Sequence, residues 1–197
     1  MTQNSEIAVV VSHTVSNFDH WKRVFDADQA ARKSAGLLGH HINRGADDPN
    51  RLAVYLPATD RARAEAFLTN PDLNATMSRA GVTSVPDVAW VQPIEAKYIA
   101  DRPVAAAMIS HEVDDYAAWK KVYDSVAPAR QKAGIIGAAV NRRLDNPNHV
   151  LVYHQAETKA QLEAFFASAE LKAAMKQAGV KGAPVITYVQ AHSGATY

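Results

Sequence analysis

The stretch SHTVSNFDHWKRVFD at residues 12–26 recurs in similar form as SHEVDDYAAWKKVYD at residues 110–124. In both copies a short apolar run leads into a serine–histidine pair, a capping residue and then an amphipathic segment that carries a tryptophan. β-Branched runs favour strands and periodic apolar stripes favour helices, so the order indicates a strand followed directly by a helix. The chain therefore contains the same structural unit twice.

The duplication extends over most of the chain. Residues 7–92 align with residues 105–190 without a gap, and 34 of these 86 positions are identical. Chance does not produce so many identities, and we predict a tandem repeat with residues 1–95 as the first copy, 96–103 as the linker and 104–197 as the second copy. Two copies are too few for a solenoid, in which at least three units stack.

Each copy has the pattern of strand, helix, strand, strand, helix, strand. In the first copy, Asn17 is suited to cap a helix that ends at Gly36. Two strands joined by the turn sequence DPN follow. The second helix begins at Asp60, restarts with Asn70 as its cap and ends at Gly81, before a final strand.

This βαββαβ order predicts an α+β, ferredoxin-like fold for each copy, with both helices on one face of an antiparallel sheet. Residues 7–11 and 105–109 are apolar at every position, whereas a strand with one wet face alternates. Both faces of these strands are then expected to be buried. We predict that the two sheets cover each other and form an intrachain α+β barrel, a pseudo-dimer of the two repeats.

The composition excludes several classes of partner. The formal net charge is +1 and there is no cysteine, which predicts no nucleic-acid partner, disulfide or thiolate metal site. No apolar run reaches the ~20 residues that span a bilayer, and the first residues, MTQNSE, lack a signal-peptide pattern. We expect a cytoplasmic protein with a small-molecule ligand and no membrane partner, either a monomer or a homodimer.

Longer segments resemble a known superfamily. RKSAGLLGHHINR at 32–44, EAFLTNPDLNATMSRAGV at 65–82 and VPDVAWVQ at 85–92, with the opening stretch, resemble the dimeric α+β barrel proteins. The resemblance is closest to antibiotic-biosynthesis-monooxygenase-like and cyclase members. It implies a pocket between the sheet and its helices and cofactor-independent chemistry on phenolic or polyketide-like compounds. Relatives also include haem-degrading enzymes and proteins without an assigned activity.

Three histidines are the candidate catalytic residues. His13 and His111 lie where the first strand of each copy ends, and His154 stands where the first copy has Leu56. An imidazole has an unperturbed pKa of ~6.5 and can accept a proton near neutral pH. The alternative for the two strand-end histidines is structural, with the ring bonded to loop backbone.

Six further residues are candidate substrate contacts. A tryptophan on the inward stripe of a helix can stack on a planar ligand, and a buried tyrosine hydroxyl needs a partner that a ligand can supply. Asparagine has a low strand propensity, and similar oxygenases use asparagine and tryptophan to hold substrate. Core packing is the alternative explanation for these residues, and it is the commoner role of an inward aromatic side chain. The candidates are Trp119, Tyr153 and Asn141 in the second copy and Trp21, Tyr55 and Asn43 in the first.

The two copies differ in side-chain volume at positions that face a pocket. His40 corresponds to Ala138, and the first strand of the second copy contains Ala105–Ala107. Smaller side chains leave more space, so we expect the roomier cavity in the second copy. Pro128 lies within the first helix of that copy and is expected to kink it.

We predict a cofactor-independent enzyme of the monooxygenase or cyclase type that acts on a planar aromatic or polyketide-like compound. Two alternatives stay open: a non-catalytic ligand-binding or stress-response barrel, and a haem-binding protein. No cofactor is expected. No metal site is expected either, because adjacent His40 and His41 point to opposite faces of a strand and no paired histidine motif occurs.

Overall fold

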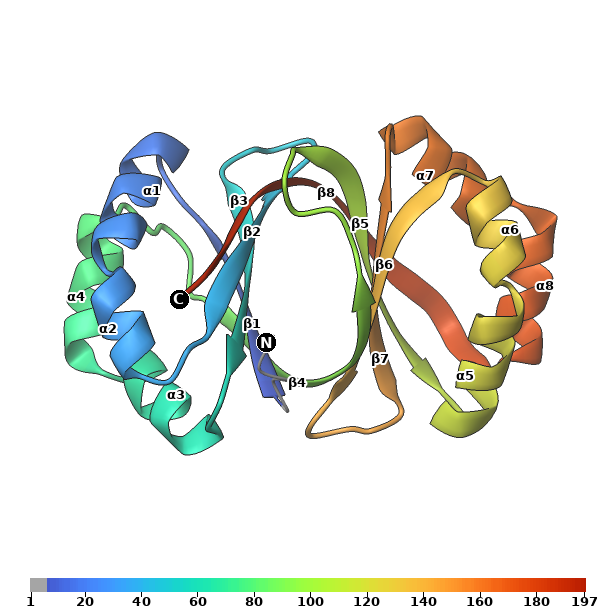
Figure 1. Cartoon of the computed structure of the whole chain (residues 1–197), viewed down its shortest axis with the longest axis horizontal. Helices are drawn as coiled ribbons and strands as arrows, with labels where there is room; N and C mark the ends of the chain where they lie inside the picture. The colour runs from blue at the N-terminus through green and yellow to red at the C-terminus, as the bar shows by residue number, and fades with distance from the viewer. Residues whose placement is uncertain (1–6) are drawn as a thin grey trace. The chain divides into compact units, whose positions relative to one another are not determined.

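The computed structural model describes residues 7–197 and has an α+β fold (Figure 1). The predicted βαββαβ order is confirmed in both repeats, with each predicted helix divided into two. The first repeat contains β1 (Ile7–Thr14), α1 (Phe18–Ala27), α2 (Gln29–Ser34), β2 (Gly39–Gly45), β3 (Arg51–Ala58), α3 (Arg61–Leu68), α4 (Pro71–Arg79) and β4 (Asp87–Lys97). The second repeat contains β5 (Val104–Val113), α5 (Tyr116–Ser125), α6 (Ala127–Lys132), β6 (Ile135–Arg143), β7 (His149–Ala156), α7 (Lys159–Ala167), α8 (Ala169–Gln177) and β8 (Val180–Thr196).

The described chain forms two compact units whose boundaries differ from those of the repeats. Unit 1 comprises residues 7–91 together with His192–Tyr197, and unit 2 comprises Gln92–Ala191. The last residues of β4 therefore belong to unit 2, and the last residues of β8 belong to unit 1. Each repeat supplies a strand end to the unit formed mainly by the other repeat.

In unit 1 the hydrogen-bonded strand order is β4-β1-β3-β2-β8. The β1–β3 ladder is antiparallel and pairs Val11 with Val54, and β2 pairs His41 with Tyr55 of β3. Helices α1 to α4 cover one face of this sheet (Figure 1). Because side chains alternate along a strand, every second residue faces these helices.

Unit 2 repeats this arrangement with the order β8-β5-β7-β6-β4 and with α5 to α8 on one face of the sheet (Figure 1). Ile109 of β5 pairs with Val152 of β7 on one side and with Ile186 of β8 on the other. The β5–β8 ladder is irregular between Ser110 and Glu112, next to the strand-end histidine. A bulge of this kind re-aims the side chains beside it.

The predicted helix caps are confirmed by their hydrogen bonds. Asn17 Oδ1 accepts from the backbone N–H of His20, and Asp115 plays the same part in the second repeat. Gly36 and Gly134 both have φ of +80°, the left-handed conformation in which glycine avoids the steric cost of a Cβ. The repeated sequence signals therefore produce the same local structure twice.

The break in the first helix of each repeat does not come from proline. Pro128 was predicted to kink this helix, and α5 does end at Ser125, before the α6 segment that contains Pro128. However, α1 and α2 are divided at Asp28, and the first repeat has Ala30 in place of the proline. Pro128 is compatible with the break because the N–H groups in the first turn of a helix have no acceptor within the helix, so proline removes no hydrogen bond there. The break itself is a feature of the shared fold.

Each unit has its own hydrophobic core between sheet and helices. In unit 1 the core includes Val9, Val54 and Trp21, and in unit 2 it includes Val140, Val152 and Trp119. Ala8 and Ala106, which point to the opposite face of the sheet, are also buried, at 0% and 1% exposed. The first strands are thus dry on both faces at these positions, as their continuous apolar sequence predicts.

Candidate functional site

A cavity of about 230 Å³ lies in unit 2 between the sheet and its helices. Side chains from β5, β7 and β8 form the sheet side, and side chains from α5, α7 and α8 form the helix side. The lining residues are Ile109, His111, Trp119, Val122, Tyr123, Val126, Val152, His154, Phe166, Leu171, Ala174, Met175, Ala178, Pro184 and Ile186. The cavity is mainly apolar, with two histidines and one tyrosine as its notable polar groups. This agrees with the expectation of space in the second repeat.

His111 is at the end of β5 and is 9% exposed. Its ring lies 5.7 Å from the ring of Trp119, measured between centroids. Neither ring nitrogen has a hydrogen-bond partner among residues 7–197. Burial, reinforced by the nearby His149, lowers the pKa of His111 to about 4, so the imidazole is neutral at pH 7. A neutral ring with free nitrogens can accept a proton or a hydrogen bond from a ligand.

His154 comes from the middle of β7 and is 5% exposed. Its Nε2 lies 3.4 Å from the hydroxyl of Tyr123, whereas its Nδ1 has no partner within the described chain. Burial is the main cause that lowers the pKa of His154 to about 3, and the charge of Arg130 acts in the same direction. His111 and His154 therefore give the cavity two neutral imidazoles on neighbouring strands.

Stacked rings on α5 form an aromatic wall. Trp119 and Tyr123 are stacked with centroids 5.0 Å apart, and the guanidinium of Arg130 lies 3.9 Å from the centroid of the Tyr123 ring. Burial raises the pKa of Tyr123 to about 12, so its hydroxyl stays protonated at neutral pH. Planar faces next to unpartnered nitrogens favour a planar ligand that carries a polar group.

Four of the five other predicted contact residues lie on the face of their sheet that is opposite the helices. Tyr153 and Asn141 neighbour Val152 and Val140, which face the helices, so strand alternation places them on the opposite face of the sheet. Tyr153 packs there against Tyr98, with ring centroids 6.1 Å apart. By the same argument Tyr55 and Asn43 lie on the far face of the sheet in unit 1. The structure therefore brings Trp119 together with His111 and His154 but separates Tyr153 and Asn141 from them.

Unit 1 repeats only part of this arrangement. His13 lies 5.6 Å from Trp21 between ring centroids, and neither of its ring nitrogens has a partner within residues 7–197. Burial lowers the pKa of His13 to about 4. At the position of His154, however, unit 1 has the buried Leu56. A second imidazole is instead supplied by His40 of β2.

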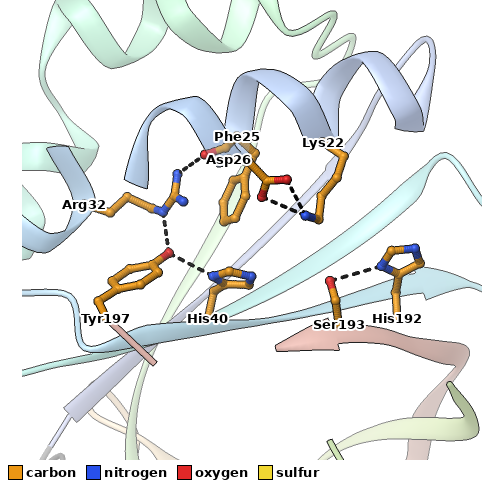
Figure 2. Close-up of polar contacts among 8 residues, drawn as sticks. All are labelled: Lys22, Phe25, Asp26, Arg32, His40, His192, Ser193 and Tyr197. Atoms are coloured by element: carbon orange, nitrogen blue, oxygen red, sulfur yellow. Dashed lines mark hydrogen bonds and ion pairs between the residues drawn. The ribbon is translucent and has the colours of Figure 1, made fainter. Parts of the chain in front are cut away.

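His40 belongs to a polar cluster that sequence reasoning did not find (Figure 2). Its Nδ1 lies 2.9 Å from the hydroxyl of Tyr197, and the same hydroxyl accepts a 2.5 Å hydrogen bond from Nε of Arg32. The guanidinium also donates to the carbonyl of Phe25 and lies 3.6 Å from the centroid of its ring. Arg32 lies in the last turn of α2, where a cation interacts favourably with the negative end of the helix. Nothing in the local sequence indicates that the distant Tyr197 binds to it.

Within the part of the chain that the structure describes, no group of three or more histidine, aspartate or glutamate side chains is placed to hold a metal ion. None of the helices formed by residues 7–197 is long and apolar enough to cross a membrane.

The comparisons with known proteins confirm the predicted resemblance. Residues 104–177, which carry most of the cavity, match the antibiotic biosynthesis monooxygenase family. A search of curated proteins gives no match. The solved structure of an anthrone oxidase-like protein is 13% identical, with a TM-score of 0.69, over 98% of this chain and 94% of that chain.

Two other solved structures share the fold over most of their length. A monooxygenase-like protein from Listeria innocua is 8% identical, with a TM-score of 0.54, over 94% of this chain and 95% of that chain. A heme-degrading enzyme from Listeria monocytogenes is 8% identical, with a TM-score of 0.52, over 92% and 98%. At these identities the likeness shows the fold alone. Together with the family match, it indicates a monooxygenase-type enzyme or a binding protein for small molecules.

Proposed function

We propose that the cavity of unit 2 binds a planar aromatic or polyketide-like compound and that the chain is a cofactor-independent monooxygenase or cyclase. The observation that carries the proposal is the pair of buried, neutral histidines with unpartnered nitrogens in an apolar cavity. Buried polar atoms are nearly always hydrogen-bonded in folded proteins, and exceptions tend to mark functional sites. A hydroxyl group on the ligand would provide a hydrogen-bond partner for these histidine nitrogens.

The size of the cavity limits the ligand. A dry cavity of ~150 Å³ accommodates benzene, and the cavity in unit 2 measures about 230 Å³. We infer a ligand with two fused rings, or with one ring and a short substituent. A three-ring compound, such as the anthrone implied by the name of one structural neighbour, is larger than this volume and would extend beyond the lining residues.

In the proposed reaction, His111 removes a proton from a phenol or enol whose ring lies on Trp119. The resulting anion is electron-rich, and its carbon bonds to dioxygen to form a hydroperoxide, which is a two-electron oxidation. The hydroperoxide then loses water as the remaining C–H proton leaves and the O–O bond breaks, which oxidises the carbon by two more electrons. One oxygen atom becomes the new carbonyl of the product and the other leaves as water, so that a CH₂ group is converted into C=O. In a cyclase the same anion instead attacks a carbonyl of its own chain, and no oxidant is needed.

The low pKa of His111 agrees with this role only when the ligand is bound. An imidazole whose conjugate acid has a pKa of about 4 is a weak base in the empty cavity. A phenolate that forms beside it stabilises the imidazolium, because opposite charges attract strongly in a dry site. Proton transfer is therefore coupled to ligand binding.

The test uses 1-naphthol as the probe. Calorimetry measures its binding, and the absorbance of 1,4-naphthoquinone with oxygen uptake measures the reaction 1-naphthol + O₂ → 1,4-naphthoquinone + H₂O. We expect binding and turnover in the parent protein and loss of turnover in His111→Ala. The matched control is His13→Ala, since His13 has nearly the same burial and the same tryptophan contact in unit 1. Equal losses in both variants would contradict the assignment to unit 2.

The experiment also separates the monooxygenase reaction from the two non-oxidative alternatives, a binding protein and a haem-binding protein. A non-catalytic ligand-binding protein would bind 1-naphthol but neither consume oxygen nor form a quinone. The heme-degrading structural neighbour motivates a hemin titration. We expect no shift of the Soret band, because a haem macrocycle is much larger than a cavity of about 230 Å³.

A further inference from the structure

We propose that Arg32 and His40 in unit 1 form a binding site for a para-substituted phenol, and that the side chain of Tyr197 occupies it in the structure (Figure 2). This site is distinct from the cavity of unit 2 and does not depend on the function proposed for that cavity. A tyrosine side chain is itself a para-alkyl phenol, so the contacts of Tyr197 show how such a ligand is held.

The hydrogen bonds match a neutral phenol in both directions. Arginine can only donate, so the hydroxyl oxygen of Tyr197 accepts from Nε of Arg32 at 2.5 Å. The single hydroxyl proton is then available to Nδ1 of His40 at 2.9 Å. Burial lowers the pKa of His40 to about 4, with the charge of Arg32 acting in the same direction, so the ring is neutral and can accept. The phenol hydroxyl therefore both accepts and donates a hydrogen bond at this site.

Arg32 is unusual because it is a buried cation whose partners are neutral. It is 3% exposed, and its hydrogen bonds go to the phenol oxygen and to the carbonyl of Phe25. Its second terminal nitrogen has no partner among residues 7–197. The guanidinium is held in place by the Phe25 ring 3.6 Å away, so its orientation does not depend on Tyr197 alone. A buried donor left unpaired is costly, which favours a guest with an oxygen.

Unit 2 has an equivalent arginine, Arg130, but lacks the counterparts of His40 and Tyr197. Arg130 donates to the carbonyl of Tyr123 in the same way that Arg32 donates to Phe25. Yet repeat 2 has Ala138 where repeat 1 has His40, and Ile99 is the counterpart of Tyr197. The shared arginine contact is therefore structural, and the phenol-accepting pair is a feature of unit 1.

The site is tested by removing the internal phenol and supplying an external one. In Tyr197→Ala, we expect p-cresol to bind about tenfold or more tightly than toluene, because only p-cresol can bond to a charged donor. Crystals of this variant soaked with 4-bromophenol locate the ligand by the anomalous signal of bromine. The expected position has the phenol oxygen within hydrogen-bond distance of Arg32 Nε and His40 Nδ1, which distinguishes this site from the cavity of unit 2.

The controls are 4-bromotoluene, which should leave the site empty, and Tyr197→Phe, which keeps the ring and should exclude 4-bromophenol. If Tyr197→Ala does not fold alone, p-cresol should restore its cooperative thermal transition and toluene should not. The proposal is overturned if no bromine peak appears beside Arg32, if 4-bromotoluene binds there equally well, or if neither compound restores a variant that fails to fold.

Discussion

The imidazole of His154 lies nearly parallel to the ring of Tyr123, with an interplanar angle of 17° and ring centroids 6.2 Å apart. At the same position in unit 1, Leu56 is buried beneath the helices. One substitution between the repeats thus changes an aliphatic core contact into a polar group that lines a cavity. The fold tolerates both residues, so the repeats serve as controls for each other.

We predict that His154→Leu lowers affinity for 1-naphthol without destabilising unit 2. The change removes an unpartnered Nδ1 and one weak 3.4 Å contact, and leucine occupies this position in unit 1. The free energy of unfolding, measured with urea, should change by less than about 1 kcal/mol or increase. A loss of more than about 2 kcal/mol would show that His154 has a structural role.

Stability should fall as the pH is lowered from about 6.5 towards 4. The folded-state pKa values of His111 and His13 are about 4 and that of His154 is about 3, whereas an unfolded histidine has a pKa near 6.5. Between these values the unfolded chain binds more protons, and acid therefore favours unfolding. The stability is fully retained above about pH 6.5, and the loss reaches on the order of 2–3 kcal/mol for each histidine by pH 4.

Urea unfolding at a series of pH values measures this dependence. His154→Leu provides the control, because removal of one buried histidine should make the curve less steep across the same interval. A curve of unchanged slope in the variant would mean that the pKa of His154 is the same in the folded and the unfolded protein.

Gln155→Leu should destabilise the protein by about 2 kcal/mol, because it leaves the partly buried backbone N–H and C=O of Ile99 without partners. Gln155 is 1% exposed, and its side chain accepts from the N–H of Ile99 at 2.7 Å and donates to the carbonyl of Ile99 at 2.8 Å. The matched control is Gln161→Leu, which removes a solvent-facing capping box and should cost less than about 1 kcal/mol. Similar losses of stability in both variants would contradict a special structural role for the two hydrogen bonds between Gln155 and Ile99.

A fragment of residues 1–98 should not form a stable, monomeric copy of unit 1. The fragment lacks His192–Tyr197, which belong to unit 1, where the backbone of Tyr197 bonds to the carbonyl of Leu38 at 2.8 Å. Without them β2 becomes an open edge, and Arg32 and His40 lose their phenol. Circular dichroism and size-exclusion chromatography provide the measurement. A folded monomer with a cooperative thermal transition would refute the prediction.

The order of elements and their ends follow from local sequence. Asn17, Asp60 and Asn70 cap helices as predicted, and Gly36 and Gly81 end them with positive φ. These signals act within a few residues, which is why a single sequence is sufficient to find them. The duplication then provides an independent second example of each one.

The sequence predicted only some of the residues that line the cavity of unit 2. Alternation along a strand already separates Tyr153 from His154, but the sequence does not say which of the two faces the helices. No residue of β7 is exposed, so the strand lacks the usual polar–apolar alternation that would decide this. Tyr123 and Phe166, which also line the cavity, were not predicted from the sequence. An aromatic residue on the apolar stripe of a helix has the same pattern as any core residue.

The sequence by itself determined that two βαββαβ repeats exist, where their helices begin and end, and which histidines are present in only one copy. Only the tertiary structure decided that residues 192–197 complete unit 1 and that Tyr197 binds Arg32. The physical reason is that caps and periodicity depend on near neighbours, whereas the pairing of a strand edge depends on contacts between residues that the chain separates by most of its length.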